Sequence, residues 1–486
     1  MKKQAGSAGS LSYVSRWSTG TRHEARDRRY SLRSVKHELQ ARLVYDMFFL
    51  HRNRCEMRTQ TPAPLGLSTM RTHFFPILAP LILLSSFSSN AAEPTAITWT
   101  KQVLDTKFRS EGVAVSDVNQ DGKKDVLNGE YWYEAPDWKP HEMQPPMDHK
   151  DGLGNYSRSF ACWCDDFNKD GYLDLIVIDF PGVPCYWMEN PKGKSGHWTK
   201  HTIWHSACNE TPLYADLFGK GKRVLVMGFQ PKGSKPEGNE GQMAYFSPNE
   251  KDADAQWDMH PISEPTVPGK AAIPGTMRFS HGLGVGDLNN DGKQDVICSG
   301  GWWEQPSQID GQSPWPFHPA NLGEACADMF AFDVDNDGKT DVLSTSAHKF
   351  GIWWYKQRPI PTDSKEAHPL FDKIELFGRL SSETHAAHFV DIDRDGNKDL
   401  VTGKRWWSHG RSEPGSNWDA RIYWLRAEKE NDGFVSFVPK LIDNDSGIGT
   451  QFEVTDINGD GLLDIISSNK KGVRVILQNV PQKSAH

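Results

Sequence analysis

The sequence has no hydrophobic run long enough to cross a membrane as a helix. Its mean hydropathy is −0.62, and the apolar segment at residues 74–84 is far shorter than the roughly 20 residues that a spanning helix requires. Cysteine is also scarce, with seven residues in a chain of 486 and no Cys-x-x-Cys pair. We therefore expect neither a disulfide framework nor a zinc site of that kind. The six cysteines that follow Cys55 can be buried free thiols or can form one or two disulfide bridges, and the sequence does not favour either alternative.

Motifs of several large enzyme classes are absent as well. The sequence contains no Gly-x-Ser-x-Gly elbow, no His-Glu-x-x-His pair and no glycine-rich nucleotide loop, so enzymes built on those motifs are not indicated. The 42 Gly and 30 Pro are too few for a low-complexity chain. The 18 Trp argue against a disordered one.

The first 69 residues differ in charge from the rest of the chain. They contain 13 Lys and Arg but only 5 Asp and Glu, without a clear periodicity. A basic arm that binds nucleic acid is one interpretation. The segment that follows favours another, in which residues 1–69 are disordered or are an upstream extension from a wrongly assigned start.

Residues 70–92 are typical of a secretory signal peptide. A short basic start at Met70 precedes the apolar segment 74–84, and small residues precede an expected cleavage near Ala91 or Ala92. A signal peptide normally acts at an N-terminus, so we interpret Met70 as the true start.

The mature chain, residues 93–486, is therefore expected to be secreted, or to lie in the periplasm or at the cell surface. Residues 1–92 carry nine net positive charges, so the mature chain carries −17 rather than the −8 of the whole sequence. This charge argues against nucleic acid as a partner. We expect a monomer with no membrane span once the signal peptide is removed.

Internal repeats dominate the mature chain. A nine-residue pattern, Asp-x-Asp/Asn-x-Asp-Gly-x-x-Asp, occurs six times, beginning at Asp117, Asp166, Asp287, Asp333, Asp391 and Asp456. A seventh, decayed copy begins at Asp216, and consecutive copies start 46 to 71 residues apart. An aliphatic run and an aromatic segment follow nearly every copy, and most units end in a fourth strand-like segment. Each unit thus has the size of a four-stranded propeller blade.

The repeats predict an all-β fold, a single seven-bladed β-propeller with four-stranded blades over residues 93–486. The seventh unit runs out after three strands, near Gln478. The N-terminal segment 99–104 has the pattern of a fourth strand that no unit uses. It is expected to complete the last blade and close the ring, which removes the open sheet edges.

The Asp-rich loops predict calcium sites. Side-chain oxygens at positions one, three, five and nine, with the backbone carbonyl of position seven, can surround a cation, and Gly at position six allows the sharp turn. This set of hard oxygen ligands suits Ca²⁺ rather than Zn²⁺, and we expect about six structural calcium ions. The predicted ligands are Asp117, Asn119, Asp121, Lys123, Asp125, Asp166, Asn168, Asp170, Tyr172, Asp174, Asp287, Asn289, Asp291, Lys293, Asp295, Asp333, Asp335, Asp337, Lys339, Asp341, Asp391, Asp393, Asp395, Asn397, Asp399, Asp456, Asn458, Asp460, Leu462 and Asp464.

Two related loops are excluded from this prediction. The decayed copy has Lys220 where a carboxylate belongs, so it is expected to bind nothing. An EF-hand needs Glu at position twelve and flanking helices, whereas these loops lack that Glu and their flanks have the pattern of strands.

The six intact loops resemble, position by position, those of the FG-GAP or VCBS repeat family. The resemblance covers essentially all of residues 93–486 and is to the bacterial secreted type, because the Phe-Gly/Gly-Ala-Pro signature of the integrin type is poorly kept. It implies a seven-bladed propeller like that of integrin α chains, with a calcium-holding loop between the first two strands of each blade. The repeat is specific for fold and metal and says little about activity.

Strand direction places a second group of residues at the face opposite the calcium loops. The residues six before the first Asp and five or six after the last Asp of each copy come together at that end of the hairpin. The candidates are Glu111, Glu210, His281, His348, His385, Lys404 and Arg405, accompanied by Glu130, Ser159, Asp179, Asp328, Lys349, Gln451, Asn469 and Lys470, with Trp406 and Trp407 close by. In contrast, His201, His260 and His318 fall on outer strands and are expected to be structural.

Three functions suit that face, beside a purely structural role as strand-end caps. The first is binding of a glycan or another cell-surface ligand at the channel mouth, without catalysis. The alternative is a carbohydrate-active enzyme, a polysaccharide lyase or a protein like aldos-2-ulose dehydratase, that uses the His, Lys and Arg side chains for β-elimination. A hydrolase acting through Glu111 and Glu210 is a third. Convergence of His281, His348 and His385 within reach of one metal ion would favour catalysis.

Overall fold

The computed structural model describes residues 97–235, 237–267, 269–323, 326–359, 368–430 and 435–480. The predicted upstream extension and signal peptide, residues 1–92, lie outside this part of the chain. Within it there are 28 β-strands and one short 3₁₀ helix, His409–Arg411, so the predicted all-β class is confirmed. No helix among these residues is long and apolar enough to span a membrane.

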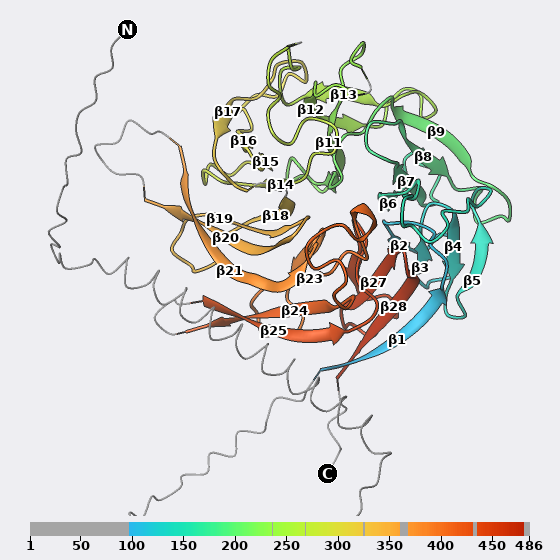
Figure 1. Ribbon diagram of the computed structural model, residues 1–486. Helices are drawn as coiled ribbons and strands as arrows, with labels where there is room; N and C mark the ends of the chain where they lie inside the picture. Colours follow the sequence, from blue (N-terminus) through green and yellow to red (C-terminus); the bar gives the residue numbers. More distant parts are fainter. Residues whose placement is uncertain are drawn as a thin grey trace, which may run out of the picture.

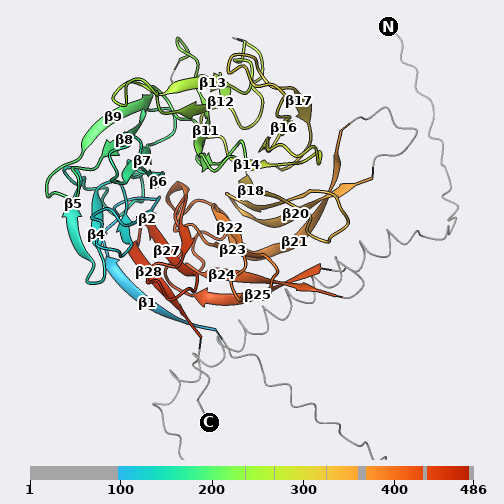
Figure 2. The same cartoon turned by 180° about the vertical axis from the view of Figure 1, so that it is seen from behind.

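The strands form five four-stranded sheets and one eight-stranded sheet, arranged around a central axis as a β-propeller (Figures 1 and 2). The four-stranded sheets that lie within one stretch of chain are β2 (Ala114–Ser116), β3 (Asp125–Leu127), β4 (Tyr131–Glu134) and β5 (Lys139–Glu142); β6 (Ala161–Asp165), β7 (Asp174–Ile178), β8 (Cys185–Glu189) and β9 (Thr199–Trp204); β10 (Leu213–Ala215), β11 (Val224–Phe229), β12 (Gln242–Ser247) and β13 (Asp258–Pro261); and β22 (Ala387–Val390), β23 (Asp399–Gly403), β24 (Ile422–Lys429) and β25 (Val435–Asp443). In each, consecutive strands pair in chain order, as short connecting loops favour.

The eight-stranded sheet consists of two such four-stranded meanders joined at their first strands. The first meander contains β14 (Leu283–Gly286), β15 (Asp295–Cys298), β16 (Gly301–Trp303) and β17 (Phe317–Pro319), and the second contains β18 (Cys326–Phe332), β19 (Asp341–Ser346), β20 (Phe350–Arg358) and β21 (Leu370–Ser382). Strand β14 pairs in parallel with β18, with Gly284 opposite Met329. A Cβ atom on Gly284 would lie 2.2 Å from the carbonyl oxygen of Met329, so this close pairing requires glycine.

The last sheet joins the two ends of the described chain. Its order is β1 (Thr98–Asp105), β28 (Gly472–Asn479), β27 (Asp464–Asn469) and β26 (Glu453–Thr455). Strand β1 is antiparallel to β28, from Thr98 opposite Asn479 onward, and the two lie side by side in Figure 1. The segment 99–104 therefore pairs with the last strand, in the outer position predicted from its sequence.

The core lies between neighbouring four-stranded meanders. One cluster joins Trp187 and Ile203 of the second sheet to Phe246 and Trp257 of the third, and others join the remaining neighbours in the same way. Trp187, Trp302 and Trp354 are fully buried. Each such side chain removes about 150–250 Å² from water, an upper estimate of roughly 4–6 kcal/mol of hydrophobic stabilisation.

The ninth residue of each Asp-rich loop has a structural role that the sequence did not reveal. All six of these carboxylates are fully buried. In each, one oxygen accepts the backbone N–H of the second loop residue, and the other accepts an N–H beside the third strand. For Asp125 these donors are Val118 and Ala135, at 3.2 and 2.9 Å. The same pair of bonds recurs at Asp174, Asp295, Asp341, Asp399 and Asp464.

The structure also shows the thiol state of the cysteines and the packing of the outer histidines. The six described cysteines are free thiols, and all but Cys164 are buried. His201 on β9 stacks on Trp187, with ring centroids 4.2 Å apart, and His260 on β13 stacks on Tyr245 at 4.6 Å. These histidines pack on the outer strands, away from the axis.

Candidate functional site

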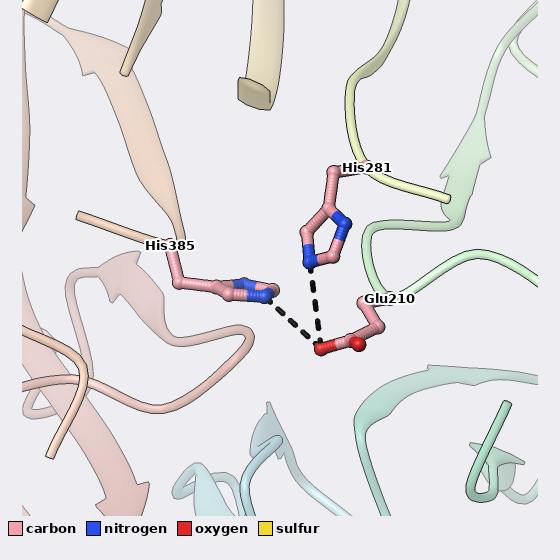
Figure 3. A group of neighbouring side chains, drawn as sticks. All are labelled: Glu210, His281 and His385. Carbon is pink, nitrogen blue, oxygen red and sulfur yellow. Dashed lines mark hydrogen bonds and ion pairs between the residues drawn. The ribbon is translucent and has the colours of Figure 1, made fainter. Parts of the chain in front are cut away.

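Three of the predicted residues meet at one point near the axis of the propeller. Glu210, His281 and His385 lie in the turns just before β10, β14 and β22, so all three come from the same end of their sheets. The Oε2 atom of Glu210 lies 3.2 Å from Nε2 of His385 and 3.6 Å from Nε2 of His281 (Figure 3). One ligand atom from each residue lies within 4.8 Å of the other two. We call these three residues the His/Glu centre.

His348 extends the His/Glu centre on one side. Its Nε2 lies 3.1 Å from Nε2 of His281, and its Nδ1 lies 3.5 Å from Oε1 of Glu413. It also stacks on His409, with ring centroids 4.7 Å apart. His281 and His385 belong with Glu210 to one group of possible metal ligands, whereas His348 belongs to a second group with His409 and Glu413, and the rings of His348 and His385 are 6.1 Å apart.

Arg405 supplies the positive charge of the centre. It is 2% exposed, and it donates to Glu111 Oε1 at 2.9 Å and to Glu210 Oε2 at 3.2 Å. Glu111 is buried too and also accepts hydrogen bonds from the backbone N–H and hydroxyl of Ser157. Two buried carboxylates without a cation would be strongly unfavourable, so Arg405 is required by both.

Burial and the neighbouring charges determine the protonation states. Burial and the nearby His281 lower the pKa of His348 to about 2, and burial and Arg405 lower that of His385 to about 3. Burial alone would raise the pKa of Glu210, but His281, His385 and Arg405 hold it well below its usual range. His348 and His385 are therefore neutral and Glu210 is ionised near neutral pH, the states in which such groups bind metal ions.

Lys470 lies on the other side of Glu111. Its Nζ donates to the carbonyl oxygen of Trp407 at 2.8 Å and is 3.8 Å from Oε1 of Glu111. It also lies 4.5 Å from the ring centroid of Tyr156. Burial lowers the pKa of Lys470 to about 8, so near neutral pH a fraction of this amine is unprotonated and can accept a proton.

Lys404 belongs to a separate buried group. Its amine binds the carboxylate of Glu383 and the hydroxyl of Ser382. Glu383 also accepts the backbone N–H and hydroxyl of Ser408. Lys404 thus has structural partners, although the sequence placed it among the candidates beside Arg405.

Several other residues predicted at this end of the hairpins make hydrogen bonds or ion pairs outside the His/Glu centre. Glu130 binds His149 at 3.0 Å, Asp179 binds Arg158, and Asn469 donates to a backbone carbonyl. Asp328 accepts the backbone N–H of Ala387. Sequence reasoning missed His149, Tyr156, Glu383, His409 and Glu413, because all five lie in loops whose lengths differ between repeats.

A cavity of about 360 Å³ lies along the axis, next to Glu210. The first strands of several sheets line it, with Trp163, Arg223, Asp328 and Glu453 among its polar and aromatic residues. The His/Glu centre therefore borders the central channel.

The Asp-rich loops are folded in a form that suits a hard cation. In the first, Asp117 accepts the backbone N–H groups of Asp121 and Gly122, and Asn119 Oδ1 also accepts that of Asp121. Gly122 has φ of 85°, a conformation that favours glycine. These contacts direct the side-chain oxygens of positions one and three into the loop, and this arrangement fits a calcium ion.

Comparison with known proteins identifies the repeat. Residues 333–402 match the model of the FG-GAP-like repeat. The chain therefore contains an FG-GAP-like repeat within a β-propeller arrangement. No curated protein matches it.

The chain is similar to two solved structures at low identity. One is an Agrocybe aegerita lectin that recognises non-reducing terminal N-acetylglucosamine, with 15% identity, 81% of this chain and 89% of that chain covered, and a TM-score of 0.38. The other is the rhamnogalacturonan lyase of Bacillus licheniformis, with 13% identity, 78% and 72% covered, and a TM-score of 0.36.

Proposed function

We propose that this FG-GAP-like propeller is a carbohydrate-active enzyme of the lyase or dehydratase type, with a divalent metal ion at the His/Glu centre. The observation that carries the proposal is the convergence of Glu210, His281 and His385 on one point. Two imidazoles and one carboxylate form the donor set of catalytic zinc and of related transition-metal sites, which keep a further position open for water or substrate. In the described chain, Nδ1 of His385 is buried without a hydrogen-bond partner. The nitrogen of this ring that would bind the metal ion is therefore Nε2, which faces Glu210.

The surrounding residues support β-elimination. Metal at the centre would polarise a carbonyl or carboxylate oxygen of the sugar. Lys470, as the free amine, takes the proton from the carbon next to that group, and the electron pair of the broken C–H bond forms the C=C bond. The C–O bond at the next carbon then breaks. Burial raises the pKa of Tyr156, so its phenol stays protonated and can donate a proton to the departing oxygen.

Aromatic side chains near the centre support a sugar as the substrate. Tyr156 is half-buried beside Lys470, and Trp406 is half-buried with Nζ of Lys471 at 4.9 Å from its ring. Flat apolar faces next to charged groups suit the alternating apolar and hydroxylated faces of a sugar ring.

A glycan-binding protein without catalysis is the second candidate. It is favoured by Arg405, which already compensates Glu111 and Glu210 without a metal ion. Its ligand would be a glycan or another molecule of the cell surface, held at the same place.

One experiment separates these candidates. Metal content is measured on the purified full chain and on His385→Ala and His201→Ala, and each protein is incubated with uronate-containing and neutral glycans. We expect about one transition-metal ion per chain, together with ultraviolet absorbance of an unsaturated product, for the wild type and for His201→Ala, and loss of both for His385→Ala. Glycan binding without metal or product would reject catalysis in favour of the binding protein.

We further propose that the ring has seven blades. The support is that the eight-stranded sheet divides into two four-stranded meanders and that β1 is the outer strand beside β28. Calcium ions in the Asp-rich loops would stabilise the propeller, and the signal peptide at residues 70–92 would export it as a monomer.

A further inference from the structure

The Asp-rich loops differ in the residue that stands at one position, at or just after the third strand of each unit. This position immediately precedes the residue whose N–H binds the ninth-position Asp. It is occupied by Glu134, Glu189, Glu304, Lys356, Arg426 and Leu477 in the six intact units. Three members are acidic, two are basic and one is apolar.

In the three acidic units the glutamate orients the third loop residue, which is Asn. The amide nitrogens of Asn119, Asn168 and Asn289 donate to Glu134, Glu189 and Glu304, at 3.4, 3.3 and 3.3 Å. The amide oxygen is thereby turned into the loop. Each glutamate also binds a histidine of the fourth strand, His141, His201 or His318, so the outer histidines hold the glutamates in place.

In the two basic units the third loop residue is Asp, and the third-strand side chain binds it directly. The Lys356 amine contacts Asp335 and, at 3.3 Å, Asp337. Arg426 contacts Asp393 at 2.5 Å and Asp395 at 2.7 Å, through two different nitrogens. In both loops the cation therefore joins the carboxylates of positions three and five, which the repeat pattern assigns to calcium.

Burial distinguishes Lys356 from the other lysines near the loops. Its side chain is 6% exposed and lies 5.4 Å from the ring of Trp354. Lys123 and Lys293 also approach loop carboxylates, but their side chains are 53% and 30% exposed and each contacts only one carboxylate. Arg426 is 30% exposed as well, but it holds the carboxylates of positions three and five through two nitrogens. An exposed lysine can turn into solvent when a metal ion binds, whereas Lys356 would be left charged and buried without its partners.

We propose that Lys356 and Arg426 are internal counterions that replace calcium in the loops beginning at Asp333 and Asp391. The loops beginning at Asp117, Asp166, Asp287 and Asp456 are the ones that take up calcium. The carboxylates of Asp333, Asp335 and Asp341 approach within 4.8 Å of one another, but the Lys356 amine already compensates this group. We call the loops beginning at Asp333 and Asp391 the self-neutralised loops. Both lie in the segment that matches the FG-GAP-like repeat, residues 333–402.

The inference rests on the proposed calcium role and is tested by counting ions. The full chain is stripped with chelator and titrated with calcium, and bound ions are counted by native mass spectrometry and equilibrium dialysis. We expect four ions per chain. Six ions would overturn the inference and leave the calcium proposal intact, whereas no bound ion would reject the calcium proposal itself.

Variants assign the ions to loops. Asp291→Asn should lower the count by one, whereas Asp395→Asn, at the same position of a self-neutralised loop, should leave it unchanged. Equal losses in these two variants would overturn the inference, and this comparison does not depend on removing a counterion.

A second pair of variants examines the counterion itself. Lys356→Gln should raise the count by one, because the carboxylates of Asp335 and Asp337 are released to a metal ion. Lys339→Gln is the matched control, because that lysine approaches Asp337 at 3.4 Å with a more exposed side chain and should leave the count unchanged. A folded Lys356→Gln protein with an unchanged count would contradict the proposal.

Discussion

Arg405 joins Glu111 to Glu210 through two different nitrogens, at 2.9 and 3.2 Å. Glu111 precedes β2, Glu210 precedes β10, and Arg405 follows β23, so one side chain links three sheets across the axis. All three residues are buried. The same contacts hold Glu210 where His281 and His385 reach it, so the stability of the propeller and the geometry of its centre depend on one guanidinium group.

Replacing Arg405 should therefore be costly. Arg405→Met removes the cation that Glu111 and Glu210 share and leaves only Lys470, 3.8 Å from Glu111. We expect a loss of about 3–5 kcal/mol in the free energy of unfolding, measured by denaturant titration. Arg358→Met is the control, because the side chains of Arg358 and its partner Asp372 are 50% and 61% exposed, and an exposed pair of that kind contributes about 0–1 kcal/mol. Similar losses in the two variants would contradict the central role of Arg405.

The two ends of the hairpins should respond differently to substitution. Asp295→Ala leaves the N–H groups of Leu288 and Gln305 without their acceptor, at a cost of roughly 1–3 kcal/mol for each group. His281→Ala removes no contact of an Asp-rich loop. We expect the melting temperature to fall, and its response to calcium to weaken, only for Asp295→Ala. Equal destabilisation by His281→Ala would indicate that the His/Glu centre is a structural cap.

Calcium should determine the stability of the whole propeller. The four loops that are expected to take up calcium contain 12 Asp residues at positions one, five and nine, whose mutual repulsion a bound cation relieves. An ion that binds only the native state stabilises it. We expect excess chelator to lower the melting temperature in calorimetry and added calcium to restore it. An unchanged melting curve in chelator would reject calcium binding.

Glu453 should make stability depend on pH. Burial in the channel raises its pKa to about 8, against a usual value of 4.5. Since the folded-state pKa is the higher one, the stability that this group contributes is complete below about pH 4.5 and is lost as the pH rises through about 8. Relative to Glu453→Gln, the wild type should lose up to about 1.4 kcal/mol per pH unit across that window.

Chemical denaturation at several pH values measures this difference. Glu428→Gln, at an exposed position on β24, should keep the pH dependence of the wild type. A constant difference between the wild type and Glu453→Gln would show that Glu453 is ionised in the folded protein.

Export should begin from Met70. A chain that starts there should be secreted and cleaved near Ala91 or Ala92, as the small residues before the junction require. Peptide mass spectrometry of the secreted protein checks the new N-terminus. Peptides from residues 1–60 in the native host would contradict the assignment of Met70 as the start.

The repeats alone determined the all-β class, the propeller arrangement and the place of the β1 strand. This is possible because each unit encodes its own hairpin: the ninth-position Asp binds the N–H groups of its own loop and third strand, and the Gly at position six permits the turn. These interactions are local in sequence, so their pattern recurs at regular intervals. Strand direction also indicated that His281, His348 and His385 share one end of their sheets.

Only the tertiary structure decided which of these residues meet. His385 lies 175 residues from Glu210, and Arg405 lies 294 residues from Glu111, so no sequence interval relates them. Lys404 follows the same pattern as Arg405 but binds Glu383. The sequence did not identify Lys356 and Arg426 as counterions, because their partners lie in the Asp-rich loops and only the register of the third strand brings them together. The ring brings distant turns to one axis, and burial there selects the pairs whose charges compensate each other.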